Sequence, residues 1–318
     1  MDSPPTLPSR PLGLSQSQAF SLLTAYCLVY VLPLYASADT RPSRNRSRDA
    51  PQSIRARIRS VSLSTAVCSL VTFLLLPQIC RQSLPNAFDC NPWHLMGYWP
   101  LGLAEAAKAS LLTSLLFAGP LYECLIIDGV WRQWFSCLQP LQELWTDWPT
   151  WRNMAAGPVT EECLFRSAAV PLLLLAGSSQ AQIIFLSPIV FGLAHVHHFY
   201  EFRITHPQTP IIAAIARSVL QFSYTSLFGA YATFLFLRSG SLLAVILVHA
   251  LCNSMGLPRV WGCVEPYWIS PVEASRPRST VIWTGIYYVL LVGGSMAWWK
   301  NLYPLTQSSV ALANIGNS

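Results

Sequence analysis

The segment from residue 158 to residue 177 reads PVTEECLFRSAAVPLLLLAG, an apolar run with two glutamates and an arginine near its start. An ionisable group at membrane depth costs roughly 3 kcal/mol or more unless it is paired or hydrated, so it points to function. Two further apolar segments carry polar residues in the same way, FGLAH at 191–195 and HALCN at 249–253. Their carboxylates, imidazoles, guanidinium and carboxamide are suited to activating a water and binding an oxyanion.

The composition is that of an integral membrane protein. The 318 residues are 53% hydrophobic and only 11% charged, against about 25% charged in an ordinary soluble domain. The arginine-rich loop at 41–59 has no interleaved aromatic residues and the rest of the chain is apolar, so nucleic-acid binding is not expected. Nine cysteines form no C-x-x-C pair, but Cys80 and Cys90 share one short loop. A disulfide between them and two free thiols both fit the sequence.

Eight apolar segments are long enough to cross a bilayer, which takes about 20 residues. They are 18–36, 60–79, 101–119, 158–177, 181–199, 211–237, 241–257 and 280–299. Tryptophans recur at helical spacing in 130–150, which predicts a helix in the membrane interface, with a buried helix as the alternative. The expected fold is all-α, a polytopic bundle of about eight transmembrane helices plus an interfacial helix. The expected regions are a disordered N-terminus at 1–17, a membrane domain at 18–299 with its catalytic core at about 158–257, and a flexible tail at 300–318.

Basic residues predict the orientation of the bundle. Seven arginines lie between Arg41 and Arg59, with Asp49 as the single acidic residue among them. Lysine and arginine stay on the cytoplasmic side, so this loop is expected in the cytosol. All three polar constellations then fall in the cytoplasmic half of the bilayer. Ala36-Ser37-Ala38 resembles a signal-peptidase site, but the long apolar run before it and the arginines after it favour an uncleaved anchor.

Helical geometry separates the roles of the two glutamates. Glu162 and Arg166 are four residues apart, so they share one face of a helix and can pair. Glu161 points about 100° away and lacks that partner. We therefore expect Glu162 to be structural and Glu161 to be free to take up and return a proton as a general base. The alternative is a glutamate–arginine clamp between helices, with Glu161 merely capping the start of its helix.

The other two constellations supply hydrogen-bonding groups. Phe191 and His195 share one helical face, as do His249 and Asn253. We expect His195 to hold the water that Glu161 deprotonates or to protonate the leaving amine. His249 and Asn253 can donate to a developing oxyanion, where each such donor contributes about 3 kcal/mol. The alternatives are a satisfied core histidine at 195 and a polar interhelical contact at 249 and 253.

Zinc chemistry is the rival hypothesis for the same residues. Histidine and glutamate are common zinc ligands, and Cys163 and Cys252 lie close to the constellations in sequence. The helical signature His-Glu-x-x-His is absent, so no metal and no other cofactor is expected. Two more histidines, His197 and His198, follow in the chain and are expected to reach the membrane interface.

The three motifs together resemble the type II CAAX prenyl endopeptidases, the Ras-converting enzymes of the endoplasmic reticulum. The pattern of that family is Glu-Glu-x-x-x-Arg, Phe-x-x-x-His and His-x-x-x-Asn. Each motif alone is weak, but in this order and in separate apolar segments they are specific. The pattern is matched here by Glu161, Glu162, Arg166, Phe191, His195, His249 and Asn253.

The resemblance implies an eight-helix bundle in the endoplasmic reticulum membrane, with a conical cavity open to the cytosol. Glu161 would activate a water positioned by His195, and His249 with Asn253 would form the oxyanion hole. The remaining motif residues would support the site. The substrates would be farnesylated or geranylgeranylated CAAX proteins, such as Ras-type and Rho-type GTPases, which would lose their last three residues. Membrane lipid is the second implied partner, because the prenyl chain lies in the bilayer.

Two other classes of function are considered. A non-catalytic relative would bind prenylated C-termini without cleaving them, but it would usually lack a catalytic residue, and none is missing here. A transporter would need a polar path across the whole bilayer and often shows an internal repeat. The polar residues here gather at one face, which favours an intramembrane endopeptidase.

Overall fold

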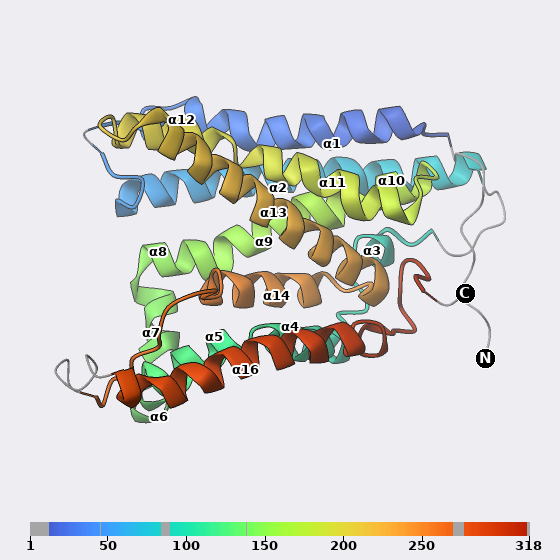
Figure 1. Ribbon diagram of the computed structural model, residues 1–318. Helices are drawn as coiled ribbons and strands as arrows, with labels where there is room; N and C mark the ends of the chain where they lie inside the picture. The colour runs from blue at the N-terminus through green and yellow to red at the C-terminus, as the bar shows by residue number, and fades with distance from the viewer. Residues whose placement is uncertain (1–12, 45, 84–89, 138, 270–276, 317–318) are drawn as a thin grey trace.

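The computed structural model describes residues 13–44, 46–83, 90–137, 139–269 and 277–316, whose regular secondary structure is helical (Figure 1). The longer helices are α1 (Gln16–Val31), α2 (Pro51–Ser83), α4 (Leu103–Leu116), α11 (Gln180–Ala194), α13 (Ile211–Ser239), α14 (Leu242–Met255) and α16 (Pro277–Asn301). The shorter helices are α3 (Pro92–Leu95), α5 (Ala118–Tyr122), α6 (Trp131–Cys137), α7 (Gln139–Thr146), α8 (Trp148–Trp151), α9 (Gly157–Glu162), α10 (Val170–Leu175) and α12 (His197–Thr205). The remaining turns are the π-helical η2 (Glu123–Ile127), η3 (Arg152–Ala156) and η4 (Cys163–Ala168) and the 3₁₀-helical η1 (Leu32–Tyr35) and η5 (Pro304–Thr306).

The described residues form a polytopic membrane helix bundle, as the composition predicts. Five helical stretches are long and apolar enough to cross a membrane, or six if α4 and its bent continuation at 118–127 count as one span. That continuation turns by 85° from α4. Two of the predicted segments are not single long helices, since η4 divides 158–177 into α9 and α10, and α14 has only 14 residues.

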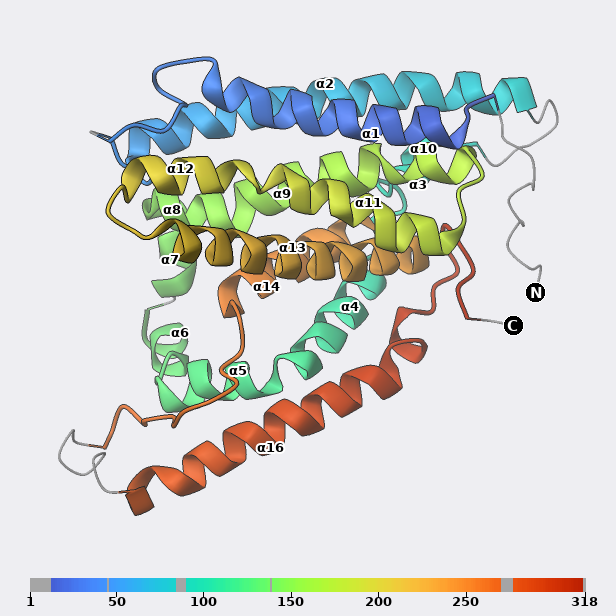
Figure 2. The same cartoon turned by 45° about the horizontal axis from the view of Figure 1, so that its top comes forward.

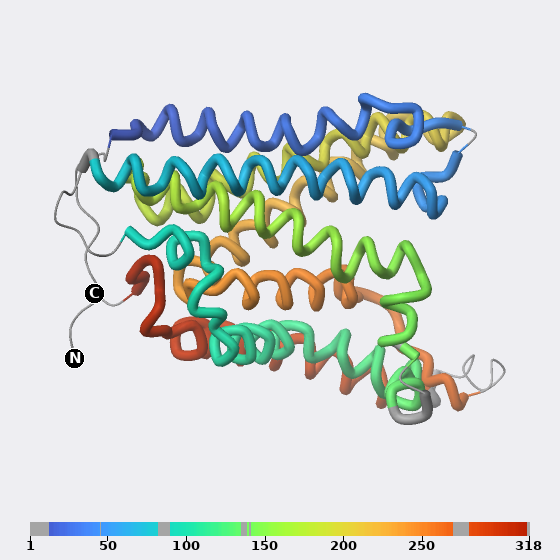
Figure 3. The backbone as a smooth tube through the Cα atoms, turned by 180° about the vertical axis from the view of Figure 1, so that it is seen from behind, coloured from blue at the N-terminus to red at the C-terminus, as the bar shows by residue number. Residues whose placement is uncertain are grey.

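The helices pack in a consistent order of neighbours. Helix α2 contacts α1, α1 contacts α11, α11 contacts α13, α13 contacts α14, α14 contacts α4, and α4 contacts α16. Figure 2 shows α16 along the outer edge of this series. The segment from α9 to α10 lies inside it, against α2, α11 and α14, and Figure 3 shows it beside α2 from behind.

The second half of the inner segment is buried on all sides. Every residue of α10 is buried, and so are Leu164, Phe165 and Arg166 in η4. A helix that is apolar all round belongs in the core of a bundle, and the run VPLLLL has that character. The two glutamates therefore lie where this buried core segment opens toward one end of the bundle.

The tryptophan-rich segment at 130–150 forms the short helices α6 and α7, followed by α8, instead of one helix. Several of its large apolar side chains are exposed, namely Trp131, Trp134, Leu141, Trp145 and Trp148. A helix buried in the bundle would hide these side chains. Exposed tryptophans fit an interfacial location, where the ring contacts both lipid and water.

The C-terminal residues pack against the bundle, in contrast to the flexible tail expected at 300–318. Arg238, at the end of α13, is buried and donates to the Thr306 hydroxyl at 2.6 Å, to the Tyr303 carbonyl at 3.0 Å and to the Ile315 carbonyl. The backbone amide of Leu312 donates to the Leu237 carbonyl at 2.8 Å. A buried guanidinium needs such acceptors, and the tail supplies them. The predicted disordered N-terminus falls mostly outside the described residues, and α1 begins at Gln16.

Helix α2 has a disulfide bond near its end and a cluster of arginines near its start. Cys80, near the end of α2, is joined to Cys90 by a disulfide bond. Arg55, Arg57 and Arg59 lie near the start of the same helix, which is 33 residues long. At about 1.5 Å per residue the disulfide lies about 35 Å from Arg57 along the helix, which exceeds the roughly 30 Å hydrocarbon core.

Candidate active site

The two glutamates end helix α9, and the π-helical turn η4 follows directly. A π-helical turn adds a residue to the helical repeat and changes the direction of the side chains around it, which is why such turns are frequent at functional sites. The Glu162 side chain is fully buried, whereas that of Glu161 is 19% exposed. The two neighbours therefore lie in different surroundings, as the helical geometry predicts.

Glu162 is the centre of a buried ionic network. Arg166 donates from Nη1 to Glu162 Oε1 at 3.1 Å and from Nη2 to the Gly229 carbonyl at 3.1 Å. His249 donates from Nδ1 to the same Glu162 oxygen at 2.6 Å. The predicted pair of Glu162 and Arg166 is present, and Glu162 also orients His249. The two residues of that second contact are 87 positions apart in the chain, so local spacing does not reveal it.

Glu161 faces two imidazoles without a direct hydrogen bond to either. Its Oε2 lies 3.9 Å from Nε2 of His195 and 3.9 Å from Nε2 of His249. These separations are too long for hydrogen bonds. A water molecule can bridge polar groups that are separated by more than 3.5 Å. The structure thus brings together three of the four predicted catalytic side chains.

In His195 and in His249, the ring nitrogen that does not face Glu161 is Nδ1, and it makes a hydrogen bond. Nδ1 of His195 donates to the Phe191 carbonyl at 2.9 Å, and Nδ1 of His249 donates to Glu162. A neutral imidazole that carries its proton on Nδ1 has a lone pair on Nε2. Both Nε2 atoms therefore accept hydrogen bonds in the neutral form. His249 can donate toward an oxyanion only when both of its ring nitrogens are protonated.

Two phenylalanines hold the charged groups in place. The Arg166 guanidinium lies 4.7 Å from the centre of the Phe191 ring and 5.7 Å from that of Phe228. The Phe191 ring also contacts His195, with centroids 4.8 Å apart, and the Phe228 ring contacts His249 at 4.5 Å. Cation–π contacts of this kind stabilise a buried guanidinium. Phe228, which belongs to none of the three motifs, is a site residue that the sequence did not indicate.

Asn253 lies one helical turn beyond His249 on α14. Its Nδ2 donates to the Asn153 carbonyl at 2.8 Å. A carboxamide has two N–H donors, so the second remains for another acceptor. Asn253 lines the same cavity as Glu161 and His195, which places the fourth predicted catalytic residue at the site.

The cavity has a volume of about 180 Å³ and is lined by residues from several helices. His249 is buried beside it. The lining residues that the sequence did not predict include the polar side chains of Tyr30, Arg48, Arg57, Arg152 and Asn153. Arg48 and Arg57 belong to an arginine cluster that was visible in the sequence. That cluster predicted the orientation of the bundle in the membrane, but it did not predict that these arginines line the cavity.

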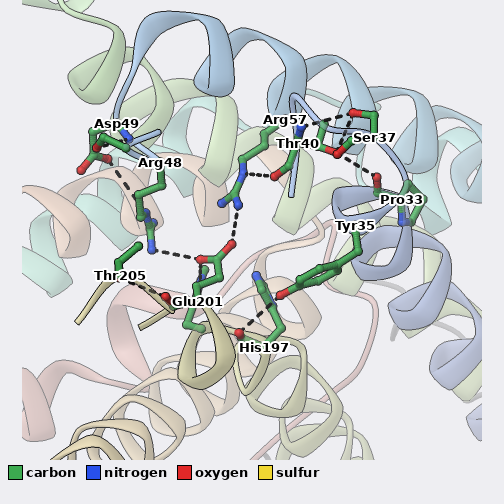
Figure 4. Close-up of polar contacts among 12 residues, drawn as sticks. Pro33, Tyr35, Ser37, Thr40, Arg48, Asp49, Arg57, His197, Glu201 and Thr205 are labelled. Atoms are coloured by element: carbon green, nitrogen blue, oxygen red, sulfur yellow. Dashed lines mark hydrogen bonds and ion pairs between the residues drawn. The ribbon is translucent and has the colours of Figure 1, made fainter. Parts of the chain in front are cut away.

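A second polar cluster adjoins the cavity and is centred on Glu201 of α12 (Figure 4). Glu201 Oε1 pairs with Arg57 at 2.5 Å, and Oε2 pairs with Arg48 at 3.4 Å. His198 donates from Nδ1 to Oε2 at 2.8 Å. His197 and His198, which the sequence analysis expected at the membrane interface, are half-buried and line the cavity. The buried Glu201 carboxylate, which attracts His198 and both arginines, is the physical reason.

The described residues contain one group of side chains close enough to share a metal ion, His197, His198 and Glu201. Both Glu201 oxygens already contact arginines, whose positive charges disfavour a cation there. The zinc alternative concerned Glu161, His195 and His249. Cys163 and Cys252 were its further candidates, and Cys163 Sγ accepts a hydrogen bond from the Tyr98 hydroxyl at 3.9 Å.

A helical membrane protein whose carboxylates and imidazoles meet in one cavity falls in the class of membrane-embedded enzymes. Residues 143–255 match the family model described as "Type II CAAX prenyl endopeptidase Rce1-like". The chain is 37% identical over 270 residues to "Probable CAAX prenyl protease 2" of Schizosaccharomyces pombe, covering 85% of this chain and 87% of the relative. It is 33% identical over 284 residues to human "CAAX prenyl protease 2", covering 86% and 79%. No solved structure gives a significant match.

The chain therefore belongs to the Rce1-like type II CAAX prenyl endopeptidase family. The similarity to the relatives covers 85% and 86% of this chain and so extends well beyond the three motifs. The predicted family and the predicted class of enzyme, a peptidase, are confirmed.

Proposed function

We propose that this protein removes the last three residues from prenylated CAAX proteins by means of a glutamate-activated water. The single observation that carries this proposal is the position of Glu161. Among the described residues its carboxylate has no hydrogen-bond partner, and it faces Nε2 of two imidazoles at 3.9 Å within a cavity. The names of the relatives, CAAX prenyl proteases, supply the substrate class.

In the proposed reaction, Glu161 takes a proton from a water that is hydrogen-bonded to His195. The resulting hydroxide attacks the carbonyl carbon of the prenylated cysteine, and a tetrahedral oxyanion forms. Asn253 and doubly protonated His249 donate hydrogen bonds to this oxyanion. The carbon–nitrogen bond then breaks, and the proton held by Glu161 passes to the leaving amine. The products are a tripeptide and a protein that ends in prenylcysteine.

The buried network supports these groups. Glu162 fixes the His249 ring, and Arg166 balances the charge of Glu162. Phe191 packs against both Arg166 and His195. We infer that these residues position the site without touching the substrate, because Glu162 and Arg166 are almost completely buried.

We further propose eight spans in the endoplasmic reticulum membrane, with the site open to the cytosol. The six possible crossings become eight if the helical segment from α8 to α10 and helix α14 also cross. The Cys80–Cys90 disulfide favours a lumenal location for its end of α2, because disulfides persist in oxidising compartments. The arginine-rich end of the same helix, which lines the cavity through Arg57, is then cytosolic.

A cleavage assay with purified protein tests the proposal. Wild-type protein is expected to release a tripeptide from a farnesylated CAAX peptide, and Glu161→Gln is expected to abolish release. Binding of the peptide without cleavage by the wild type would indicate a non-catalytic binder. Loss of wild-type activity on addition of a chelator, with recovery on addition of zinc, would indicate metal chemistry at the same residues.

A further inference from the structure

The cavity carries more positive charge than the proposed hydrolysis uses. Arg48, Arg57 and Arg152 line it together with Glu161. Among the described residues these arginines pair with two carboxylates, Glu201 and Asp49, and the ion contacts of Glu161 are with histidines instead. Three guanidinium groups thus share two carboxylate partners at the site where the substrate is expected.

The three arginines differ in how firmly they are held. Arg57 donates to the Thr40 carbonyl at 2.8 Å and pairs with Glu201 at 2.5 Å, and its side chain is only 12% exposed. Arg48 is held loosely, because it lies 3.4 Å from Glu201 and 3.9 Å from Asp49. Figure 4 shows the Arg48 side chain between these two carboxylates. Desolvation by burial is the largest influence on Arg48 and lowers its pKa, so its charge is not fully compensated.

Arg152 also has a replaceable partner. It pairs with Asp49 at 2.7 Å, but the Asp49 side chain is 54% exposed. Ion pairs with an exposed partner contribute little, because water screens them. An anion that enters the cavity can therefore displace Asp49 from Arg152 and approach Arg48 at the same time. Arg57, in contrast, is committed to Glu201 and fixes that carboxylate in place.

We propose that Arg48 and Arg152 bind the free carboxylate at the C-terminus of the substrate. A guanidinium group matches a carboxylate through two parallel hydrogen bonds. The three residues between the cleaved bond and the C-terminus span at most about 10 Å, so both ends of this tripeptide fit near one site. This inference rests on the proposed function and adds to it an explanation of how the enzyme sets the number of residues that it removes. The carboxylate is anchored at the arginines, and the third peptide bond from the end then lies at Glu161.

Two matched peptides test the inference. Both carry the same farnesylated CAAX sequence, but one ends in a free carboxylate and the other in a carboxamide. Wild-type protein is expected to cleave the carboxylate peptide with a kcat/KM about 10- to 100-fold higher, as expected for a lost charge-assisted hydrogen bond. In Arg48→Gln and Arg152→Gln the ratio of the two kcat/KM values is expected to fall toward one, mainly because KM for the carboxylate peptide rises.

Arg59→Gln is the control, because Arg59 is exposed on α2, two residues from Arg57, and does not line the cavity. It removes one positive charge from the same end of the bundle and is expected to keep the wild-type ratio. The ratio compares two substrates of one preparation, so partial misfolding of a variant does not change it.

A wild-type ratio near one would overturn the inference, and the proposed function would survive. Equal losses on both peptides in the two cavity variants would also overturn it, since the arginines would then be merely structural. An equal fall of the ratio in Arg59→Gln would point to general attraction of anions instead of binding in the cavity. Failure of the proposed function would look different, because wild-type protein would cleave neither peptide.

Discussion

At the scale of single residues, the contrast between Glu161 and Glu162 gives the sharpest test of the site. Glu161→Gln removes the proposed base but leaves no buried charge without a partner. We expect activity to fall by at least about 100-fold, with a change in the free energy of unfolding below about 1 kcal/mol. Glu162→Gln leaves the buried Arg166 without its carboxylate, so we expect a loss of about 3–5 kcal/mol of stability.

The two variants are compared by thermal unfolding in detergent and by cleavage of a farnesylated peptide. The substitution is isosteric in both, and the positions are adjacent in the chain, so each variant controls for the other. Glu161→Gln with wild-type activity would remove the proposed base from the mechanism. A Glu162→Gln variant as stable as the wild type would show that Arg166 does not depend on this pair.

Asn253 supports a second prediction at this scale. Asn253→Ala removes a hydrogen-bond donor that the mechanism uses at the oxyanion. We expect kcat to fall by about 100- to 1,000-fold with little change in KM, because the donor acts mainly in the transition state. Steady-state kinetics with the farnesylated peptide measures both values. A rise in KM with unchanged kcat would instead assign Asn253 to substrate binding.

The sequence predicted the local part of the site and missed the long-range part. The pair of Glu162 and Arg166 followed from four-residue spacing in one helix. The contact of Glu162 with His249 joins α9 to α14, and no local pattern encodes it. The same holds for Arg48 and Arg152, which are far apart in the chain and both pair with Asp49. Phe228 was missed because a phenylalanine in an apolar helix gives no signal of its own.

At the scale of helices, the close contact of α11 with α13 depends on a glycine. A Cβ atom added at Gly229 would lie 2.8 Å from Pro188 Cβ, 3.2 Å from the Phe191 ring and 3.3 Å from Arg166 Nη2. Gly229→Ala is therefore expected to push α13 away from the buried network. We expect a loss of about 1–3 kcal/mol of stability, as for other overpacked sites, and a lower kcat.

Gly285→Ala in α16 is the matched control, since a Cβ atom there would meet nothing within 4 Å. This variant is expected to unfold at the wild-type temperature or slightly above it, because alanine favours a helix. Thermal unfolding and peptide cleavage are measured on both variants in the same detergent. A Gly229→Ala variant with wild-type stability and activity would mean that α13 is free to shift at this contact.

The apolar runs correctly predicted where helices form, but they did not predict where a helix is interrupted or bent. The segment 158–177 is apolar enough for one span, yet η4 interrupts it directly after the glutamates. The predicted span at 101–119 ends in an 85° bend between α4 and α5. Apolar composition sets how much of a helix is buried or faces lipid, whereas bends and π-helical turns depend on the neighbouring helices. The predicted interfacial helix is also divided, and there the sequence contributes, since Pro149 lies in the first turn of α8, where proline favours the start of a helix.

At the scale of the whole molecule, tertiary contacts order a segment that composition alone left undefined. The C-terminal residues contain little that predicts structure, and they were expected to be flexible. Arg238 lies at the end of α13, where burial of its guanidinium requires acceptors. The carbonyls of Tyr303 and Ile315 supply them, so the tail is fixed by a residue more than 60 positions earlier.

The orientation of the whole bundle leads to the last prediction. The cavity opens beside the arginine-rich start of α2, and the disulfide marks the other end of that helix. If the arginines lie in the cytosol, a folded prenylated protein added to sealed vesicles of endoplasmic reticulum, cytosolic face outward, reaches the site directly. We expect full cleavage without detergent, and a variant of the same vesicles with Glu161→Gln controls for other proteases. Cleavage that appears only after the vesicles are permeabilised would place the cavity in the lumen, because a folded protein cannot cross the bilayer. The arginines and the disulfide would then have to exchange sides, against both the charge rule and the redox state of the two compartments.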